Sequence, residues 1–304
     1  MTPCSSDSSI HLYPREIPGD LMFNLLKADL YRMTRPKRLH GYLWRYLVWL
    51  ACICALVAVA GVITSRESAD IVFGDQRFSS LSQFFGMYLI STGVLQFLVC
   101  LGVLQLMLSD LKQGFIQTVI DSKRGRALYA VEKIVMAGIW TAIMELILAI
   151  ALLALFIPFA RYDSLISEPG IFLLWMFETW ICVWALAVAF IVIASLTRNS
   201  GVSYIASLFI ISGFVPSALQ ALSSLTEVML SLPALSHTLA ELSAWLPSSC
   251  LAVLGSGGIA LVQPAVSAAG LLPGGFGTQA LIVSAGWIAA LSAGLLMLFR
   301  RRSI

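Results

Sequence analysis

Long stretches without charge are the feature that most limits what this chain can fold into. A helix needs about twenty consecutive apolar residues to cross the hydrocarbon core of a bilayer. Only 12% of the 304 residues are charged and 59% are hydrophobic, which excludes a water-soluble fold. The sequence therefore predicts an all-α polytopic membrane protein with six transmembrane helices. The six segments that qualify are about 42–64, 84–108, 134–158, 171–195, 202–222 and 279–299.

The basic residues outside these segments predict how the chain is oriented. Sixteen Lys and Arg residues fall in the N-terminal region, in the loops after the second and fourth segments and at the C-terminus. The opposite side carries three, which are Arg66, Arg77 and Arg161. Loops rich in Lys and Arg remain in the cytoplasm. We therefore expect a multi-pass protein of the cell (cytoplasmic) membrane with both termini cytoplasmic.

The region before the first span divides into two parts. Residues 1–19 form a polar cytoplasmic tail, and residues 20–41 carry apolar residues at helical spacing followed by basic residues. Those apolar residues are Leu21, Leu25, Leu26, Leu30 and Met33. The pattern is typical of an amphipathic helix at the membrane interface, on the inner leaflet. The alternative is an ordinary basic flank that only sets orientation.

Residues 42–304 hold the six-span domain, and its outer segment is unusual. Residues 223–278 are rather apolar, and Glu227 and Glu241 are their only Asp, Glu, Lys or Arg residues. Proline interrupts every apolar run in this segment before it reaches spanning length. We expect short surface or re-entrant helices here, because irregular apolar backbone cannot face lipid.

The loop between the second and third spans combines an apolar stripe with basic residues. Phe115, Ile116, Val119 and Ile120 recur at helical spacing over about 110–121, and Lys112, Lys123 and Arg124 lie around them. A short amphipathic helix of this kind can insert its apolar face into a groove of a cytoplasmic partner. The alternative is a helix that rests on the lipid headgroups.

No constellation for covalent chemistry is evident in the sequence. His11, His40 and His237 lie outside the spans and far apart, so a metal site is not expected. The glycine-rich pieces at 255–258 and 273–277 contain no lysine, so neither is a phosphate-binding loop. We expect no catalytic residue, no bound cofactor and no metal in this chain, and we expect no nucleic-acid partner.

Two acidic residues do lie within spans. Glu145 is near the middle of the third segment and Glu178 is about seven residues into the fourth. A charged group inside the membrane is costly, which makes both residues candidates for a substrate path or for an interface with a second chain. The alternative is a protonated or hydrogen-bonded packing residue. The tryptophans of these two spans fit a lipid-accessible path, although packing is their more common role.

The order of parts resembles the type-2 ABC transporter permease family. Residues 110–135 are similar to a "DxKxGxI…RGxxxxxK" run in its lantibiotic-immunity and bacitracin-type branch. The matching residues are Asp110, Lys112, Gly114, Ile116, Arg124, Gly125 and Lys133. Residues 25–37 and the WLPSSCLAVL segment at 245–254 also resemble that branch.

The resemblance implies that the helix between spans two and three is a coupling helix that docks onto a separate ATPase subunit. The implied contacts are Lys112, Gly114, Phe115, Ile116, Val119, Ile120, Lys123 and Arg124. It also implies two copies of the ABC ATP-binding subunit, which bind the ATP and Mg, and a second permease chain, identical or related.

The leading hypothesis is therefore an ABC permease that exports or extracts an antimicrobial peptide, a drug or another lipophilic substrate. A proton-coupled secondary transporter that uses Glu145 or Glu178 is the alternative. A membrane anchor that recruits a cytoplasmic protein through 110–126 is a third possibility. An integral-membrane enzyme is the least favoured.

Overall fold

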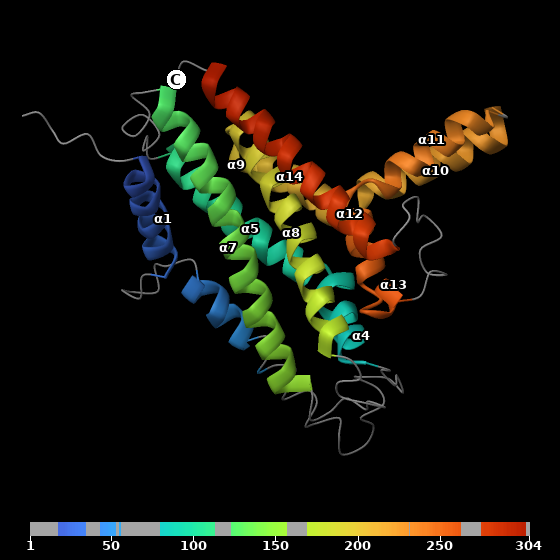
Figure 1. The fold of residues 1–304 in the computed structure, drawn as a ribbon, viewed down its shortest axis with the longest axis horizontal. Helices are drawn as coiled ribbons and strands as arrows, with labels where there is room; N and C mark the ends of the chain where they lie inside the picture. Colours follow the sequence, from blue (N-terminus) through green and yellow to red (C-terminus); the bar gives the residue numbers. More distant parts are fainter. Residues whose placement is uncertain are drawn as a thin grey trace, which may run out of the picture.

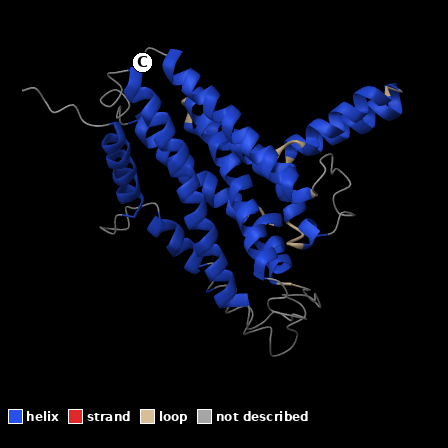
Figure 2. Ribbon diagram, in the orientation of Figure 1, coloured by secondary structure: helices blue, strands red, loops and turns tan. Residues whose placement is uncertain are grey.

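A computed structural model describes residues 18–34, 43–52, 55, 80–112, 123–156, 169–230, 232–262 and 275–301. These ranges are helical or form short connections, and no strand occurs within them (Figure 2). The chain is an all-α protein, as the sequence predicts. Its long apolar helices make it a multi-pass membrane protein.

Four helices of the described chain are long and apolar enough to cross a membrane on their own. They are α5 (Val94–Lys112), α7 (Lys123–Phe156), α8 (Pro169–Thr197) and α14 (Phe276–Arg301). A fifth candidate is the pair α9 (Ser200–Ile211) and α10 (Phe214–Leu230), which is bent by 57° at its break. Of the first expected span, 42–64, the structure describes the short apolar helix Leu43–Cys52, and the rest lies largely outside the described residues.

Two expected spans are broken where the sequence predicts continuous helices. The segment 84–108 begins as α4 (Leu81–Phe85) and the π-helix η2 (Gly86–Ser91), and α5 starts only after Gly93. The segment 202–222 is interrupted at Gly213. Gly93 and Gly213 both have positive φ, 72° and 69°, a conformation that glycine adopts without steric cost. Apolar composition averaged over each segment did not reveal these breaks, because they fall at short interruptions, Ser91-Thr92-Gly93 and Ser212-Gly213.

The third expected span is longer than predicted. Helix α7 contains 34 residues and starts at Lys123, so Lys123 and Arg124, expected around the apolar stripe of the loop, belong to its first turn. At 1.5 Å per residue α7 measures about 50 Å, more than the roughly 30 Å of a bilayer core. The helix therefore extends beyond the apolar layer at its basic end.

A helical hairpin begins within the expected fifth span, 202–222, and continues into the expected outer segment. Helices α10 and α11 (Pro233–Ala244) pack along each other and project away from the bundle (Figure 1). Helices α12 (Pro247–Leu254) and α13 (Ile259–Val262) follow. Proline occupies the first turn of both α11 and α12, where its missing N–H is not needed.

The core lies between α5, α7, α8 and α14 (Figure 1). Trp184 Nε1 donates to the carbonyl of Ile134 at 2.9 Å, and Trp180 Nε1 donates to the carbonyl of Gly138 at 3.0 Å, so α8 is bonded to two successive turns of α7. Trp175 Nε1 donates to the carbonyl of Leu254 at 2.9 Å and holds α12 on α8. These tryptophans connect helices within the bundle.

The glycine-rich turn at 255–258 is a packing element. A Cβ on Gly257 would lie 2.5 Å from the backbone of Gln83, and a Cβ on Gly86 would lie 2.6 Å from the carbonyl oxygen of Gly255. Glycine permits this close approach of the turn after α12 to α4 and η2.

Candidate functional site

A buried network of charges joins three helices at one end of the bundle. Helix α1 (Pro18–Thr34) contributes Asp29 and Arg32, α5 contributes Asp110 and α7 contributes Lys133. Asp110 precedes and Lys133 follows the segment 113–122, which lies outside the described residues. The network therefore involves residues on both sides of the expected coupling helix.

Asp110 is the centre of this network and is fully buried. Its Oδ1 accepts from Arg32 Nη1 at 2.6 Å. Its Oδ2 lies 2.7 Å from Lys133 Nζ and accepts from Tyr129 Oη at 3.0 Å. A buried carboxylate is tolerated only when it is paired and hydrogen-bonded, and Asp110 meets that requirement with three donors.

Lys133 connects the same network to α1. Its Nζ donates to Asp29 Oδ2 and lies 3.5 Å from Glu132 Oε2. The ammonium also lies 5.0 Å from the centre of the Tyr129 ring, within the range of a cation–π interaction. Two cations, Lys133 and the partly exposed Arg32, thus face three buried carboxylates, and both cations contact Asp29 and Asp110.

Packing reinforces the attachment of α1. Met33 is 1% exposed and borders a small internal space beside Met107, Lys133 and Met136. The helix expected at 20–41 is present from Pro18 to Thr34, and Asp29 and Met33 form its buried side. The sequence analysis missed Asp29. The sequence did contain one indication of its role, because Asp29 is an acidic residue one turn before Met33 on a helix face that is otherwise apolar.

The candidate coupling residues are only partly described. Lys112 is exposed at the last position of α5. Lys123 and Arg124 are the first two residues of α7, and their side chains are not described. Gly114, Phe115, Ile116, Val119 and Ile120 lie outside the described residues.

Both intramembrane acids are buried in the bundle. Glu178 is 1% exposed, and its Oε1 would lie 2.6 Å from a Cβ on Gly277, so the side chain sits where α8 and α14 pack together. Glu145 is 3% exposed on α7. Within the described chain, Oε1 of Glu145 and Oε2 of Glu178 have no hydrogen-bond partner. No group of three His, Cys, Asp or Glu in the described ranges could hold a metal ion.

Fold and site together define a helical multi-pass membrane protein with a charged network that connects its helices at one end. No protein-family model matches the sequence, and no curated protein matches it either.

Proposed function

We propose that the chain is the membrane-spanning permease subunit of an ATP-driven ABC transporter. The buried contact between Asp110 and Lys133 carries this proposal. Both residues belong to the run that resembles the ABC permease branch. Their contact joins α5, near its last turn, to α7, about three turns past its start, and both residues also contact α1. A displacement of that segment by a partner would therefore move α5, α7 and α1 together.

The network explains how a partner's motion could reach the spans. A separate ATPase subunit, present in two copies, would contact the segment 113–122 and close on binding ATP. Since the charges are buried, the connection resists the screening that weakens surface ion pairs. In this proposal the chain crosses the cell membrane six times with both termini cytoplasmic, and it works with a second permease chain, identical or related.

The proposed cargo is an antimicrobial peptide, a drug or another lipophilic molecule that is exported or extracted from the membrane. The composition supports a lipophilic cargo, because the spans offer apolar surface and no Lys or Arg occurs in expected spans two to six. Buried acids could hold a cation or a proton, and the unpartnered oxygens of Glu145 and Glu178 favour a proton-coupled secondary transporter as the second candidate.

Co-purification tests the first proposal. The chain would be expressed with an ATPase encoded in a neighbouring reading frame and purified through a tag on the chain. We expect the ATPase to co-purify and to be lost when Phe115→Asp is combined with Ile116→Asp. The matched control is Val228→Asp with Met229→Asp, the same change on an apolar pair of α10 that is 80% and 77% exposed. A well-folded wild-type chain that purifies without any ATPase contradicts the proposal.

A further inference from the structure

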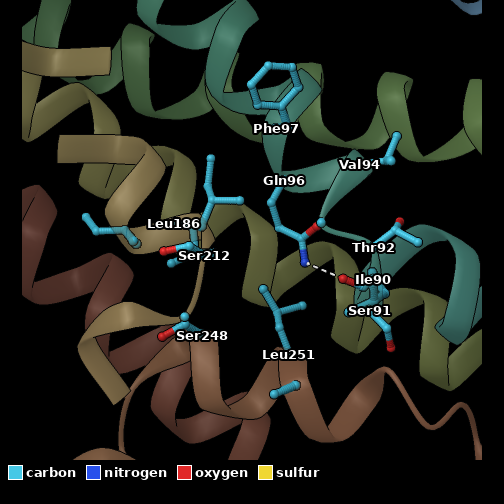
Figure 3. Close-up of a pocket in the computed structure, with 15 residues that line it drawn as sticks. Ile90, Ser91, Thr92, Val94, Gln96, Phe97, Leu186, Ser212, Ser248 and Leu251 are labelled. Carbon is cyan, nitrogen blue, oxygen red and sulfur yellow. Dashed lines mark hydrogen bonds between the residues drawn. The ribbon is translucent and has the colours of Figure 1, made fainter. Parts of the chain in front are cut away.

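The fifth candidate span leaves the bundle where it breaks. Residues 210–213 line a cavity of about 580 Å³ together with residues 90–94, 96 and 97 (Figure 3). A Cβ on Gly93 would lie 3.7 Å from Cγ2 of Ile211, so the break at Gly213 is held against the break at Gly93. From there the hairpin of α10 and α11 runs across the long helices and away from them (Figure 1).

Two arginines mark one surface of the bilayer. Arg198 follows the last residue of α8, and Arg300 lies at the end of α14. These helices run in the same direction, because two contacts between them follow the same order along both helices, Glu178 with Gly277 and Cys182 with Ser284. An arginine at the end of an apolar helix places its charge at the membrane surface. Arg198 and Arg300 therefore lie at the same surface.

The hairpin begins and ends within the hydrocarbon layer. Helix α9 has 12 residues, so the break at Gly213 lies about 18 Å from the surface that Arg198 marks. At the other end of the hairpin, Trp287 Nε1 of α14 donates to the carbonyl of Trp245 at 2.8 Å. Trp287 precedes Arg300 by 13 residues, which is about 20 Å of helix. In a core of about 30 Å, both ends of the hairpin thus lie roughly 10 Å from the opposite surface.

Burial within the hairpin is the reverse of that in a water-soluble helical pair. Its seam contains hydroxyl groups, and Ser223 Oγ donates to the carbonyl of Ser236 at 2.8 Å. The buried seam residues are Ser223, Thr226, Ser236 and Ser243. Large apolar side chains lie outside and are between 50% and 80% exposed, namely Leu222, Leu225, Val228, Met229 and Leu242. Apolar burial drives pairing in water, whereas helices in lipid associate through small and polar residues, so the hairpin fits an apolar surrounding.

The outer surface of the hairpin has a polar side and an apolar side. Exposed polar residues recur every three or four positions along α10, at Ser217, Gln220, Ser224 and Glu227. On α11, His237 Nδ1 lies 3.1 Å from Glu241 Oε1. Since the two helices are antiparallel, this spacing places both polar stripes on the same side of the hairpin. The opposite side carries Leu222, Leu225, Met229, Leu235 and Leu242.

Apolar residues continue from the bundle to the tip of the hairpin. Phe209 of α9 and Phe214 of α10 are both exposed, and their ring centres are 5.4 Å apart across the break. At the tip, residues 228–235 include no charged residue, and Leu232 is exposed before α11. A turn in water usually carries Gly, Asn or Asp. The apolar side is therefore continuous with the lipid-facing surface of the bundle.

We propose that the hairpin of α10 and α11 lies in the plane of the bilayer and binds phospholipid. Its apolar side lies against the acyl chains. Its polar side, with Glu227, His237 and Glu241, faces the headgroups of the leaflet opposite Arg198 and Arg300. An amphipathic helix in this position sits about 5–10 Å below the headgroups, in agreement with the depth of the two ends of the hairpin. This inference does not rest on the proposed transport function.

Photocrosslinking of the full chain in phosphatidylcholine vesicles tests which molecule covers the apolar side. The photoreactive residue p-benzoylphenylalanine replaces Leu225 or Met229. It also replaces Ile150 of α7, which is 65% exposed, as a lipid-facing reference. Mass spectrometry of peptides identifies the adducts. We expect phospholipid adducts at all three positions.

A matched pair of variants places charge on either side of the hairpin. Val228→Asp with Met229→Asp should abolish the phospholipid adduct of the probe at Leu225, because the charged tip leaves the lipid. The bundle should stay folded, because the hairpin joins it at its base. Ser224→Asp adds charge on the polar side, and the adduct of the probe at Leu225 should remain.

Cysteine labelling tests the polar side. A charged maleimide is present on both sides of the vesicle membrane, and peptide mass spectrometry separates each new cysteine from the native ones. His237→Cys should react in intact vesicles. Met229→Cys should react only after denaturation in SDS, because its thiol lies in the hydrocarbon layer.

Three outcomes overturn this inference. Covalent dimers in place of phospholipid adducts at Leu225 and Met229 would show that a second copy covers the apolar side. Adducts at Ile150 alone would place the hairpin in water. Equal maleimide reactivity of the two cysteine variants in vesicles would show that the hairpin has no separate lipid-facing side. None of these measurements involves an ATPase, so the inference and the proposed function can fail separately.

Discussion

The ammonium of Lys133 lies 2.7 Å from Oδ2 of Asp110, although the whole segment 113–122 separates the two residues in the chain. The same ammonium also contacts Asp29 of α1. One lysine, about three turns past the start of α7, thus holds together α7, the last turn of α5 and the N-terminal helix. If the segment 113–122 is a coupling helix, this contact holds together the two helices that flank it.

Lys133→Met should destabilise the protein strongly. The change keeps much of the side-chain volume but leaves Asp29 and Asp110 buried without their shared cation, which should lower the free energy of unfolding by about 3–5 kcal/mol. Thermal unfolding in detergent measures this loss. Lys112→Met makes the same change at an exposed position and should alter stability by less than about 0.5 kcal/mol. Equal melting temperatures for the two variants would contradict the proposed role of the network.

Met33→Ala should loosen α1. Met33 is 1% exposed, and truncation of a buried methionine costs about 2–5 kcal/mol. Because α1 is attached along one side only, the effect should appear as faster hydrogen exchange in residues 18–34, with little change in α8. Phe23→Ala removes a larger side chain that is 68% exposed and serves as the control. Unchanged exchange in α1 of the Met33 variant would show that the helix is held by other contacts.

Gly102→Ala should disturb the contact between α5 and α7. A Cβ at this position would lie 2.1 Å from Nε1 of Trp140, which is itself 1% exposed and cannot move aside freely. Overpacking of this kind typically costs about 1–3 kcal/mol. Gly286→Ala on α14 adds the same methyl group where no atom lies within 4 Å, and it should change stability by less than about 1 kcal/mol. Thermal unfolding of the two variants, compared in the same detergent, provides the measurement.

Glu145→Gln and Glu178→Gln distinguish the two transport hypotheses. Each change preserves shape and removes the ability to carry a proton. An ATP-driven permease should retain most of its transport in both variants and should not respond when a protonophore collapses the pH gradient. A proton-coupled carrier should lose transport in at least one variant and should stop when the gradient collapses. Flux of a fluorescent lipophilic substrate into vesicles containing the chain and its ATPase provides the measurement.

The sequence alone determined the class of protein and most of its helices. Long runs without charge can be stable only as membrane helices, so α8 and α14 lie within two or three residues of the predicted bounds. The glycines and prolines of 223–278 likewise indicated short helices, because proline cannot continue a helix. These features are local, and each could be inferred from neighbouring residues.

Only the tertiary structure decided where polar residues meet. Asp29, Asp110 and Lys133 come from three distant segments, and no local pattern indicates that they share one buried site. The breaks at Gly93 and Gly213 line one cavity only because the helices that carry them pack together. Hydropathy indicates the free-energy cost of placing a polar residue in lipid. Which partner offsets that cost depends on how the other helices pack around the residue.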